Sequence, residues 1–518
     1  MIRSILTVSM GTLVSRLLGF ARDAMVAALL GAGPVADAFL VAFQLVNVVR
    51  RLLTEGALNA ALIPAWLRIR SIDGEAAAAA FAGRVLGTLS AALVIATVVV
   101  GVAMPLLIAL LAPGFRGTAT LQLAVDNARL MLPYLAFAGP VAVMMGLLNA
   151  QDRFALTAFS PVLFNLALIG VMAALLLERP DAAAAATLLA ATVGMAGLLQ
   201  LAMFALRSGE AVATPLRLSW DAQMRGFLRK AMPGMIANSG PQLLIVAGAI
   251  IASHAPSAVS WLYFANRLIE LPLGIVGTAM GTVLVPELTR AVRSGDPAAI
   301  HGAESRGLEL AVGLALPATL GLMVLSAPIV QLLFEHGAFT AVDSLATAQA
   351  LTLLALSLPA HVLVKALAPA FFARDDTMTP LMATLAGLLA VVTAAWLLRG
   401  FGVAGIAGSI ALGAWSCAVV LILRGRATFG FSIDAAAQMR LPRIVLAALA
   451  MGAALWLEAH VVRAWVPDAL VIAQAALVGV LIASALVVYG AALALFGVVT
   501  PAGAWRAFRQ SRAGDLRA

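Results

Sequence analysis

Apolar runs long enough to cross a membrane recur from one end of this 518-residue chain to the other. A helix of ~20 apolar residues is needed to cross a hydrocarbon core of ~30 Å. The pattern predicts fourteen such spans, at 5–31, 36–65, 82–112, 121–149, 156–177, 184–206, 232–253, 258–286, 306–334, 344–372, 379–398, 403–423, 443–463 and 470–497. The first run far exceeds the apolar part of a signal peptide and has no small-residue cleavage site, so we expect no cleaved leader.

The distribution of basic residues supports this count. If the N-terminus is cytoplasmic, 22 of the 33 lysines and arginines fall in cytoplasmic segments, 5 fall on the opposite side, and the rest lie inside spans. Cytoplasmic loops of membrane proteins carry this excess of positive charge. We therefore predict an all-α polytopic membrane protein with fourteen transmembrane helices and both termini in the cytoplasm. The loops also account for the net charge of +9, so nucleic acid is not an expected partner.

Composition removes several other classes of function. Hydrophobic residues make up 63% of the chain and charged residues 11%, and the single cysteine, Cys417, excludes a disulfide framework. The five histidines have no metal-ligand spacing, and no phosphate-binding GxxxxGK[ST] loop is present. We expect no cofactor, no nucleotide and no catalytic triad or carboxylate pair. Metal ligands are not identifiable, so energy for transport would come from a substrate gradient, a monovalent cation or the membrane potential.

The chain also resembles itself at an offset of 222–223 residues. The matching features, in order, are 61–64 with 283–286, Arg84 with Arg306, and 150–152 with 373–375. Two six-helix repeats that both begin on the cytoplasmic side are parallel, and a substrate site is expected between them near mid-membrane. We predict an N-terminal lobe over 1–218, a C-terminal lobe over 219–430, and a last part over 431–518 with spans 13, 14 and a cytoplasmic tail.

Charged residues inside the predicted spans are the most informative chemical feature. They are Arg16, Arg22, Arg50, Arg51, Glu55, Arg267, Glu270 and Lys365. A charge at the centre of a membrane helix costs at least ~2.5–3.5 kcal/mol, so these side chains should face protein or water. The excess of cations indicates a wet cavity that binds something negative.

Two interpretations of these charges remain open. In one, each cation is neutralised by a nearby carboxylate: Asp23 adjoins Arg22, and the pairs Arg51–Glu55 and Arg267–Glu270 are four and three residues apart. The bundle would then be held by internal salt bridges. In the other, Arg16, Arg50 and Lys365 leave positive charge over, since they have no carboxylate close by in sequence. Guanidinium groups suit phosphate, and diphosphate above all.

Several segments resemble the MurJ (MviN) family. They are 15–23, 37–39, 47–57, 263–274, 333–340 and 365–380, and the resemblance runs from span 1 to about span 12. Asn266 stands where some members carry Asp, and Ala370 where Gly is usual. The first departure puts any cation or proton role of that position in doubt. The ligands of the sodium site that some members have near span 7 are not identifiable in this sequence.

The resemblance implies a lipid II flippase of the MOP exporter superfamily in the bacterial inner membrane. Its substrate would be undecaprenyl-diphosphate-linked disaccharide-pentapeptide, in a phospholipid bilayer, and we expect a monomer. Spans 13 and 14 would guide the lipid tail. By matching motif, the substrate-binding residues would be Arg16, Arg22, Arg50 and Arg267. Candidate cavity or gating residues are Asp23, Asp37, Asn47, Arg51, Glu55, Ser260, Asn266, Glu270 and Lys365.

Three rival functions make different demands on the sequence. A flippase for another polyprenyl-diphosphate oligosaccharide, or a multidrug exporter of the same superfamily, would share the fold. A cationic-drug antiporter, however, should have an acidic cavity. A membrane transferase on prenyl diphosphates needs a carboxylate or histidine motif, for which 374–376 is the only candidate, and we interpret that motif as a loop and helix start. A scaffold without transport activity has no reason to bury unpaired arginines.

Overall fold

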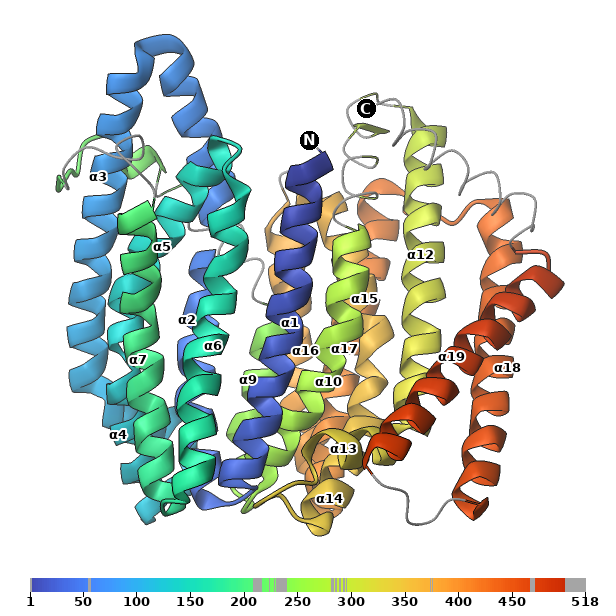
Figure 1. The fold of residues 1–518 in the computed structure, drawn as a ribbon. Coiled ribbons are helices and arrows are strands. Elements are labelled where there is room, and N and C mark those ends of the chain that lie inside the picture. The colour runs from blue at the N-terminus through green and yellow to red at the C-terminus, as the bar shows by residue number, and fades with distance from the viewer. Residues whose placement is uncertain are drawn as a thin grey trace. The chain divides into compact units, whose positions relative to one another are not determined.

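The computed structural model describes residues 2–54, 57–207, 217–222, 224–227, 240–280, 296–372, 376–465 and 471–498, together with positions 229, 284, 287, 290–291, 294 and 374. Over these residues the protein is helical, with two short 3₁₀ turns (Figure 1). Ten of the described helices or helix pairs are long and apolar enough to cross a membrane, and 34–48 and 242–252 are shorter apolar helices. The protein is therefore an all-helical polytopic membrane protein, as predicted.

The chain divides into two compact units. The first contains α1 to α7 with residues 249–260 and 336–340, and the second contains 243–248, 261–335 and the chain from Ala341 onward. The helices of the first unit are α1 (Ile2–Leu30), α2 (Pro34–Thr54), α3 (Ala57–Leu111), α4 (Ala119–Met131), α5 (Pro133–Ala150), α6 (Phe154–Glu178) and α7 (Ala182–Arg207). Helix α9 (Gly240–Ala252) is shared between the units.

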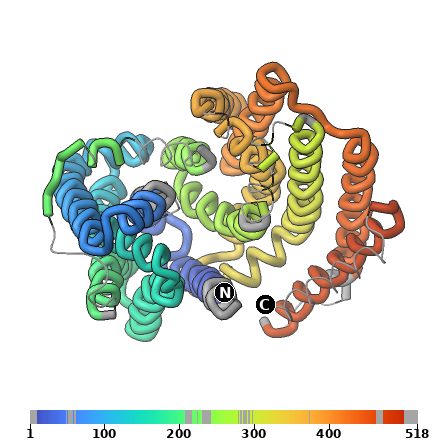
Figure 2. Tube along the Cα trace, turned by 90° about the horizontal axis from the view of Figure 1, so that it is seen from above, coloured from blue at the N-terminus to red at the C-terminus, as the bar shows by residue number. Residues whose placement is uncertain are grey.

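The second unit contains the rest of the helical chain. Its helices are α10 (Ala258–Ala279), which begins in the first unit, then α12 (Pro297–Val324), α13 (Ser326–Phe334), α14 (Ala341–Ala355), α15 (Ser357–Phe372), α16 (Met378–Leu397), α17 (Gly402–Phe429), α18 (Ala435–Trp465) and α19 (Val471–Leu495). Helix α18 lies beside α12 (Figure 2), where the Tyr489 hydroxyl of α19 donates a hydrogen bond to the Gly313 carbonyl at 2.7 Å. The predicted three-part division stays a prediction.

Several predicted spans consist of two helices. The span 121–149 breaks between α4 and α5, where Pro133 cannot continue the hydrogen-bond ladder. The spans 306–334 and 344–372 break after Val324 and Ala355, and the first of them begins earlier than expected, at Pro297, where Asp296 caps α12. Breaks of this kind let one apolar run change direction within the membrane.

Helix α3 extends well beyond the predicted span 82–112. It is helical on both sides of Gly74, whose φ of 88° and ψ of 176° are not helical. The chain therefore rises, turns back at Gly74 and descends again (Figure 1). Glycine adopts this backbone conformation without the clash that a side chain would add. Residues 66–81, which lie between two predicted spans, are thus the helical tip of this hairpin.

Candidate functional site

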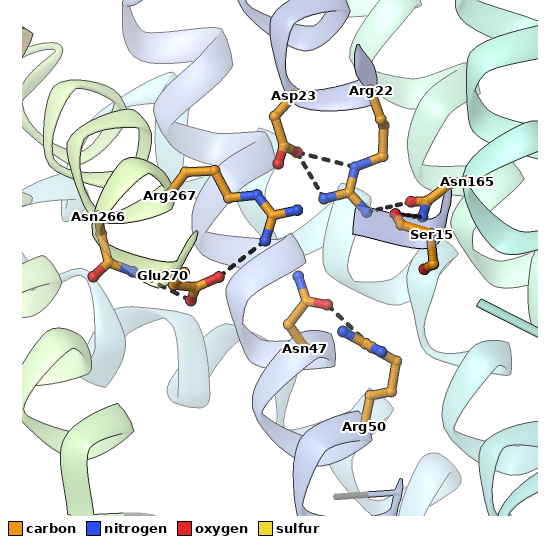
Figure 3. Close-up of polar contacts among 9 residues, drawn as sticks. All are labelled: Ser15, Arg22, Asp23, Asn47, Arg50, Asn165, Asn266, Arg267 and Glu270. Carbon is orange, nitrogen blue, oxygen red and sulfur yellow. Dashed lines mark hydrogen bonds and ion pairs between the residues drawn. The ribbon is translucent and has the colours of Figure 1, made fainter. Parts of the chain in front are cut away.

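In the first unit, Arg22 on α1 is held by three hydrogen bonds (Figure 3). Its Nε and one terminal nitrogen donate to Asp23 Oδ1 at 3.0 and 2.7 Å, and its other terminal nitrogen donates to Asn165 Oδ1 at 3.1 Å. The Arg22 residue is only 8% exposed, and the guanidinium carbon lies 5.1 Å from the ring centre of Phe43 and 5.9 Å from that of Phe164. The group is neutralised, enclosed and fixed in direction.

Asn165 is a polar residue of this site that is not among the residues predicted from the sequence. This residue of α6 is buried, and its amide nitrogen donates to the Ser15 carbonyl of α1 at 3.1 Å while its oxygen accepts from Arg22. Asn165 therefore ties α6 to α1 at two points. The available signal was a lone amide in the middle of an apolar run, because such a group must find partners when it is buried.

Arg50 and Arg16 lie in the same unit on α2 and α1. Arg50 Nε donates to Asn47 Oδ1 at 3.3 Å, one turn back along α2, so these two residues share a face of the helix. Arg16 is half-buried and has no hydrogen-bond or ion-pair partner among the described residues. The predicted pair of Arg51 and Glu55 is not assessed, because the Arg51 side chain and all of Glu55 lie outside the described residues.

In the second unit, three polar residues of α10 form a local cluster. Arg267 donates to Glu270 Oε2 at 2.9 Å, and the Asn266 amide donates to Glu270 Oε1 at 3.4 Å. The spacing of three residues explains the first contact, as expected from the sequence. Asn266 thus donates to the carboxylate that also pairs with Arg267, and as a neutral amide it changes the charge of neither group.

Lys365 of α15 lies against α10 at a glycine. A methyl group on Gly277 would be 3.1 Å from the Lys365 ammonium nitrogen, so the lysine end group rests directly on the helix backbone there. The Lys365 residue itself is exposed. Glycine in a membrane helix allows this close approach of a neighbouring helix.

Asp37 and Ser260, both expected to lie in a cavity or gate, contact each other. The Asp37 carboxylate accepts the backbone N–H groups of Ser257 and Ser260, each at 2.9 Å, and also the Ser260 hydroxyl. It therefore caps the N-terminus of α10, where an acidic group is favoured by the exposed amides and the helix dipole. Ser257 has a φ of 65°, a left-handed conformation that its bond to Asp37 helps to hold.

The loop 336–340 closes over the end of α1 within the same unit. Ala338 N–H donates to the Ala28 carbonyl at 2.8 Å. Gly31 and Gly337 both have positive φ, and a Cβ on Gly337 would be 2.3 Å from the Ala28 carbonyl oxygen. Only glycine fits so close a backbone contact in that conformation. This end of α1 is thus packed backbone against backbone.

The transferase alternative rested on residues 374–376. Asp376 Oδ1 accepts the Thr379 N–H at 2.9 Å at the start of α16, and hydrogen bonds from Thr379 hold the pKa of Asp376 below its usual range. Arg374 stacks over Phe429, with its guanidinium carbon 4.0 Å from the ring centre. Among the described residues, no group of three His, Cys, Asp or Glu side chains could hold a metal ion. The described part of this motif is a helix cap.

Arg16, Arg22 and Arg50 thus belong to the first unit and Arg267 to the second. Their convergence on one cavity stays a prediction. The geometry shows that Arg22 and Arg267 each have a carboxylate partner and that Arg50 donates to the Asn47 amide oxygen.

Charged and amide side chains on long apolar helices are the features of a membrane transporter. The fold agrees: a solved structure titled lipid II flippase MurJ in an inward closed conformation matches with a TM-score of 0.73 at 20% identity, covering 95% of this chain and 98% of that one. An inward-facing multidrug transporter of the MATE family in the MOP superfamily matches with a TM-score of 0.65 at 16% identity, covering 85% and 98%.

Sequence comparison gives the family. The family model described as lipid II flippase MurJ matches residues 26–476. Probable lipid II flippases MurJ of Rhizobium meliloti and Rhizobium tropici are 38% and 34% identical, covering 88% and 96% of this chain and 86% and 95% of those proteins. The lipid II flippase MurJ of Burkholderia cenocepacia is 33% identical over 81% of this chain and 83% of its own length. The chain belongs to the MurJ family of lipid II flippases.

Proposed function

We propose that this protein moves lipid II across the bacterial inner membrane, as a transporter and not an enzyme. The family match over residues 26–476 carries this conclusion. The cationic residues of the apolar helices support it independently, because a diphosphate crossing the membrane needs a positively charged path. The sugar-peptide headgroup would occupy a wet cavity between the two repeats, while the prenyl chain remains in the bilayer.

Within that proposal, the arginines have different roles. Arg50 and Arg16 bind the diphosphate, because both are partly buried guanidinium groups on the apolar helices α2 and α1. Arg267 exchanges Glu270 for the substrate, because the two half-buried side chains lie on one turn of a single helix and separate without moving the backbone. Arg22, which is paired with Asp23, orients α1 against α6 through Asn165. Lys365 adds a positive charge beside α10.

Alternating access requires an end that closes and reopens. The Asp37 cap on α10 and the interlocked glycines at 31 and 337 are contacts of a closed end. We infer that these contacts break when the cavity opens on that side. By the predicted topology of fourteen spans with both termini inside, it is the outer side. Coupling to a cation or to the membrane potential would bias this equilibrium.

A binding experiment with the purified protein in nanodiscs distinguishes the alternative substrates. We expect lipid II to bind and to be displaced by undecaprenyl diphosphate. Lipid II should bind more weakly to the Arg50→Ala and Arg267→Ala variants. The cationic dyes that multidrug exporters carry should not bind. Binding of the dyes instead would favour the multidrug alternative, to which the MATE fold also points. Equal binding of several polyprenyl-diphosphate oligosaccharides would favour a broader flippase.

A further inference from the structure

A segment that precedes α9 is docked along the first unit's longest helix. Thr88 of α3 and Ser219 are joined by two hydrogen bonds at 3.1 Å, one in each direction, and Arg217 N–H donates to the Gly83 carbonyl at 3.4 Å. A Cβ on Gly87 would lie 2.6 Å from the Arg217 carbonyl oxygen, so the close approach depends on that glycine. These contacts fix the position of residues 217–219 along the axis of α3, beside Gly83 to Thr88.

Side chains complete the docking. Arg84 of α3 forms a salt bridge with Asp221 at 3.0 Å, and Asp221 also accepts the Met224 N–H at 2.7 Å, which caps a helical turn. Phe227 packs edge-on against Phe81 with ring centres 6.0 Å apart, and Met224 and Phe227 are both buried. The side chains of Asp221 and Phe227 therefore contact α3, and those of Met224 and Phe227 are buried.

The opposite face combines apolar and basic side chains. Leu218 is 75% exposed and Trp220 is 68% exposed. Arg217, Arg225 and Arg229 are exposed as well. Exposed tryptophan beside arginine is the usual composition at a membrane surface, where the ring lies at headgroup level and the cations meet lipid phosphates.

The level of this face along α3 agrees with such a position. On one side of the docking site lies the hairpin tip, where Arg68, Arg70 and Glu75 are exposed; on the other, Val94, Val102 and Leu106 are exposed. The exposed charges of the tip indicate water, whereas the exposed apolar stretch from Val94 to Leu106 indicates hydrocarbon, so the boundary falls between residues 75 and 94. Gly83 to Thr88, where the segment is bonded, lies in the middle of that interval.

We propose that the face formed by Arg217, Leu218, Trp220, Arg225 and Arg229 binds anionic phospholipid headgroups at the surface of the membrane. Trp220 and Leu218 enter the headgroup layer, and the three arginines select negative lipids. By the predicted topology this is the cytoplasmic leaflet. The site is separate from the proposed substrate path, and it needs only the membrane location of the family, not flipping.

A spin label tests the depth of the face in the full-length protein in nanodiscs, with Cys417 replaced by alanine. The label is attached in Trp220→Cys and, as references, in Ile72→Cys at the hairpin tip and Val99→Cys in the exposed apolar stretch. Ile72 and Val99 are 67% and 60% exposed, which makes them matched controls. We expect the label at position 72 to be accessible to a water-soluble nickel complex and the label at position 99 to be accessible to oxygen dissolved in lipid. The accessibility of the label at position 220 to nickel should lie between those of the labels at 72 and 99.

Lipid charge tests the arginines. We expect the label at 220 to become less mobile when phosphatidylglycerol is added to zwitterionic nanodiscs, and the response to fall at least threefold in Arg217→Gln/Arg225→Gln/Arg229→Gln. Arg116→Gln/Arg129→Gln, which removes two exposed cations elsewhere in the unit, should leave it unchanged. A label at 220 as accessible to nickel as the one at 72 would overturn the proposal and indicate a soluble partner for this face. An unchanged response in the triple variant would also overturn it.

Discussion

Asp37 and Ser260 are hydrogen-bonded to each other and lie 223 residues apart, which is the offset of the internal repeat. Each stands near the start of its own helix, α2 or α10, so positions that the predicted repeat makes equivalent meet within the first unit. Asp37 provides the carboxylate, and Ser260 provides both its amide and its hydroxyl. The carboxylate of α2 thus caps α10, a contact that only the folded chain can form.

The Asp37 cap should be measurable as stability. In Asp37→Ala the amides of Ser257 and Ser260 lose their acceptor, and loss of a helix cap costs ~0.5–2 kcal/mol. We expect a lower thermal unfolding midpoint in detergent, with a smaller decrease in Ser260→Ala, which keeps the amide donor. Asp126→Ala is the control, since Asp126 is exposed and accepts only a side-chain bond from Gln122. Equal midpoints in Asp37→Ala and Asp126→Ala would show that the cap contributes nothing.

Asn165 should matter through Arg22. Asn165→Leu fills similar space but removes the acceptor for Arg22 and the donor to Ser15, and a hydrogen bond to a charged group contributes ~1.5–3 kcal/mol. We expect flipping to fall about tenfold or more while the protein still reaches the membrane. Asn165→Gln should recover part of the activity. Thr187→Ala, at an exposed site of α7, is the control. Full activity in Asn165→Leu would mean that Arg22 needs no such support.

The proposed substrate-binding arginines should be intolerant of alanine. Arg16→Ala, Arg50→Ala and Arg267→Ala are each expected to abolish flipping, since a charge-assisted diphosphate contact is worth on the order of 1.5–3 kcal/mol. Arg22→Ala is expected to do the same because α1 loses the hydrogen bond from Arg22 to Asn165 of α6. Lysine should restore only part of the activity, because it lacks the guanidinium fork. Arg116→Ala, exposed and outside the apolar helices, should behave as wild type. Normal complementation by Arg50→Ala and Arg267→Ala would make these residues structural.

Helices α18 and α19 should affect long-chain substrates most. They pack on α12 and carry many small residues, and the family resemblance implies that they guide the prenyl chain of the substrate. Deletion of 431–518 is expected to impair flipping of long-chain lipids more than of short-chain analogues. An equal loss with both chain lengths, together with lower protein abundance, would show that the two helices only stabilise the second unit.

The sequence predicted what depends on short spacing. Arg22 with Asp23, Asn47 with Arg50, and Arg267 with Glu270 are neighbours along one helix, and helical geometry alone brings them together. The apolar runs likewise predicted where most helices lie. Both kinds of inference need only local information.

Contacts between segments that are distant in the chain could not be predicted from the sequence. Arg22 with Asn165 and Asp37 with Ser257 join residues 143 and 220 positions apart, and their partners depend on how the helices pack. The breaks after Val324 and Ala355 were also missed, because hydropathy does not change where an apolar helix bends. The helical hairpin tip at Gly74 is too polar to register as a span, although its backbone is helical on both sides.

Direct measurement of lipid II at the outer leaflet is the most decisive experiment. The protein would be expressed in a bacterium depleted of its own flippase, and outward-exposed lipid II would be quantified alongside growth. Restored exposure and growth with the wild-type protein, and neither with correctly inserted Arg50→Ala, are the predicted results. Lipid II that stays on the inner leaflet while the wild-type protein is present in the membrane would contradict a flippase function.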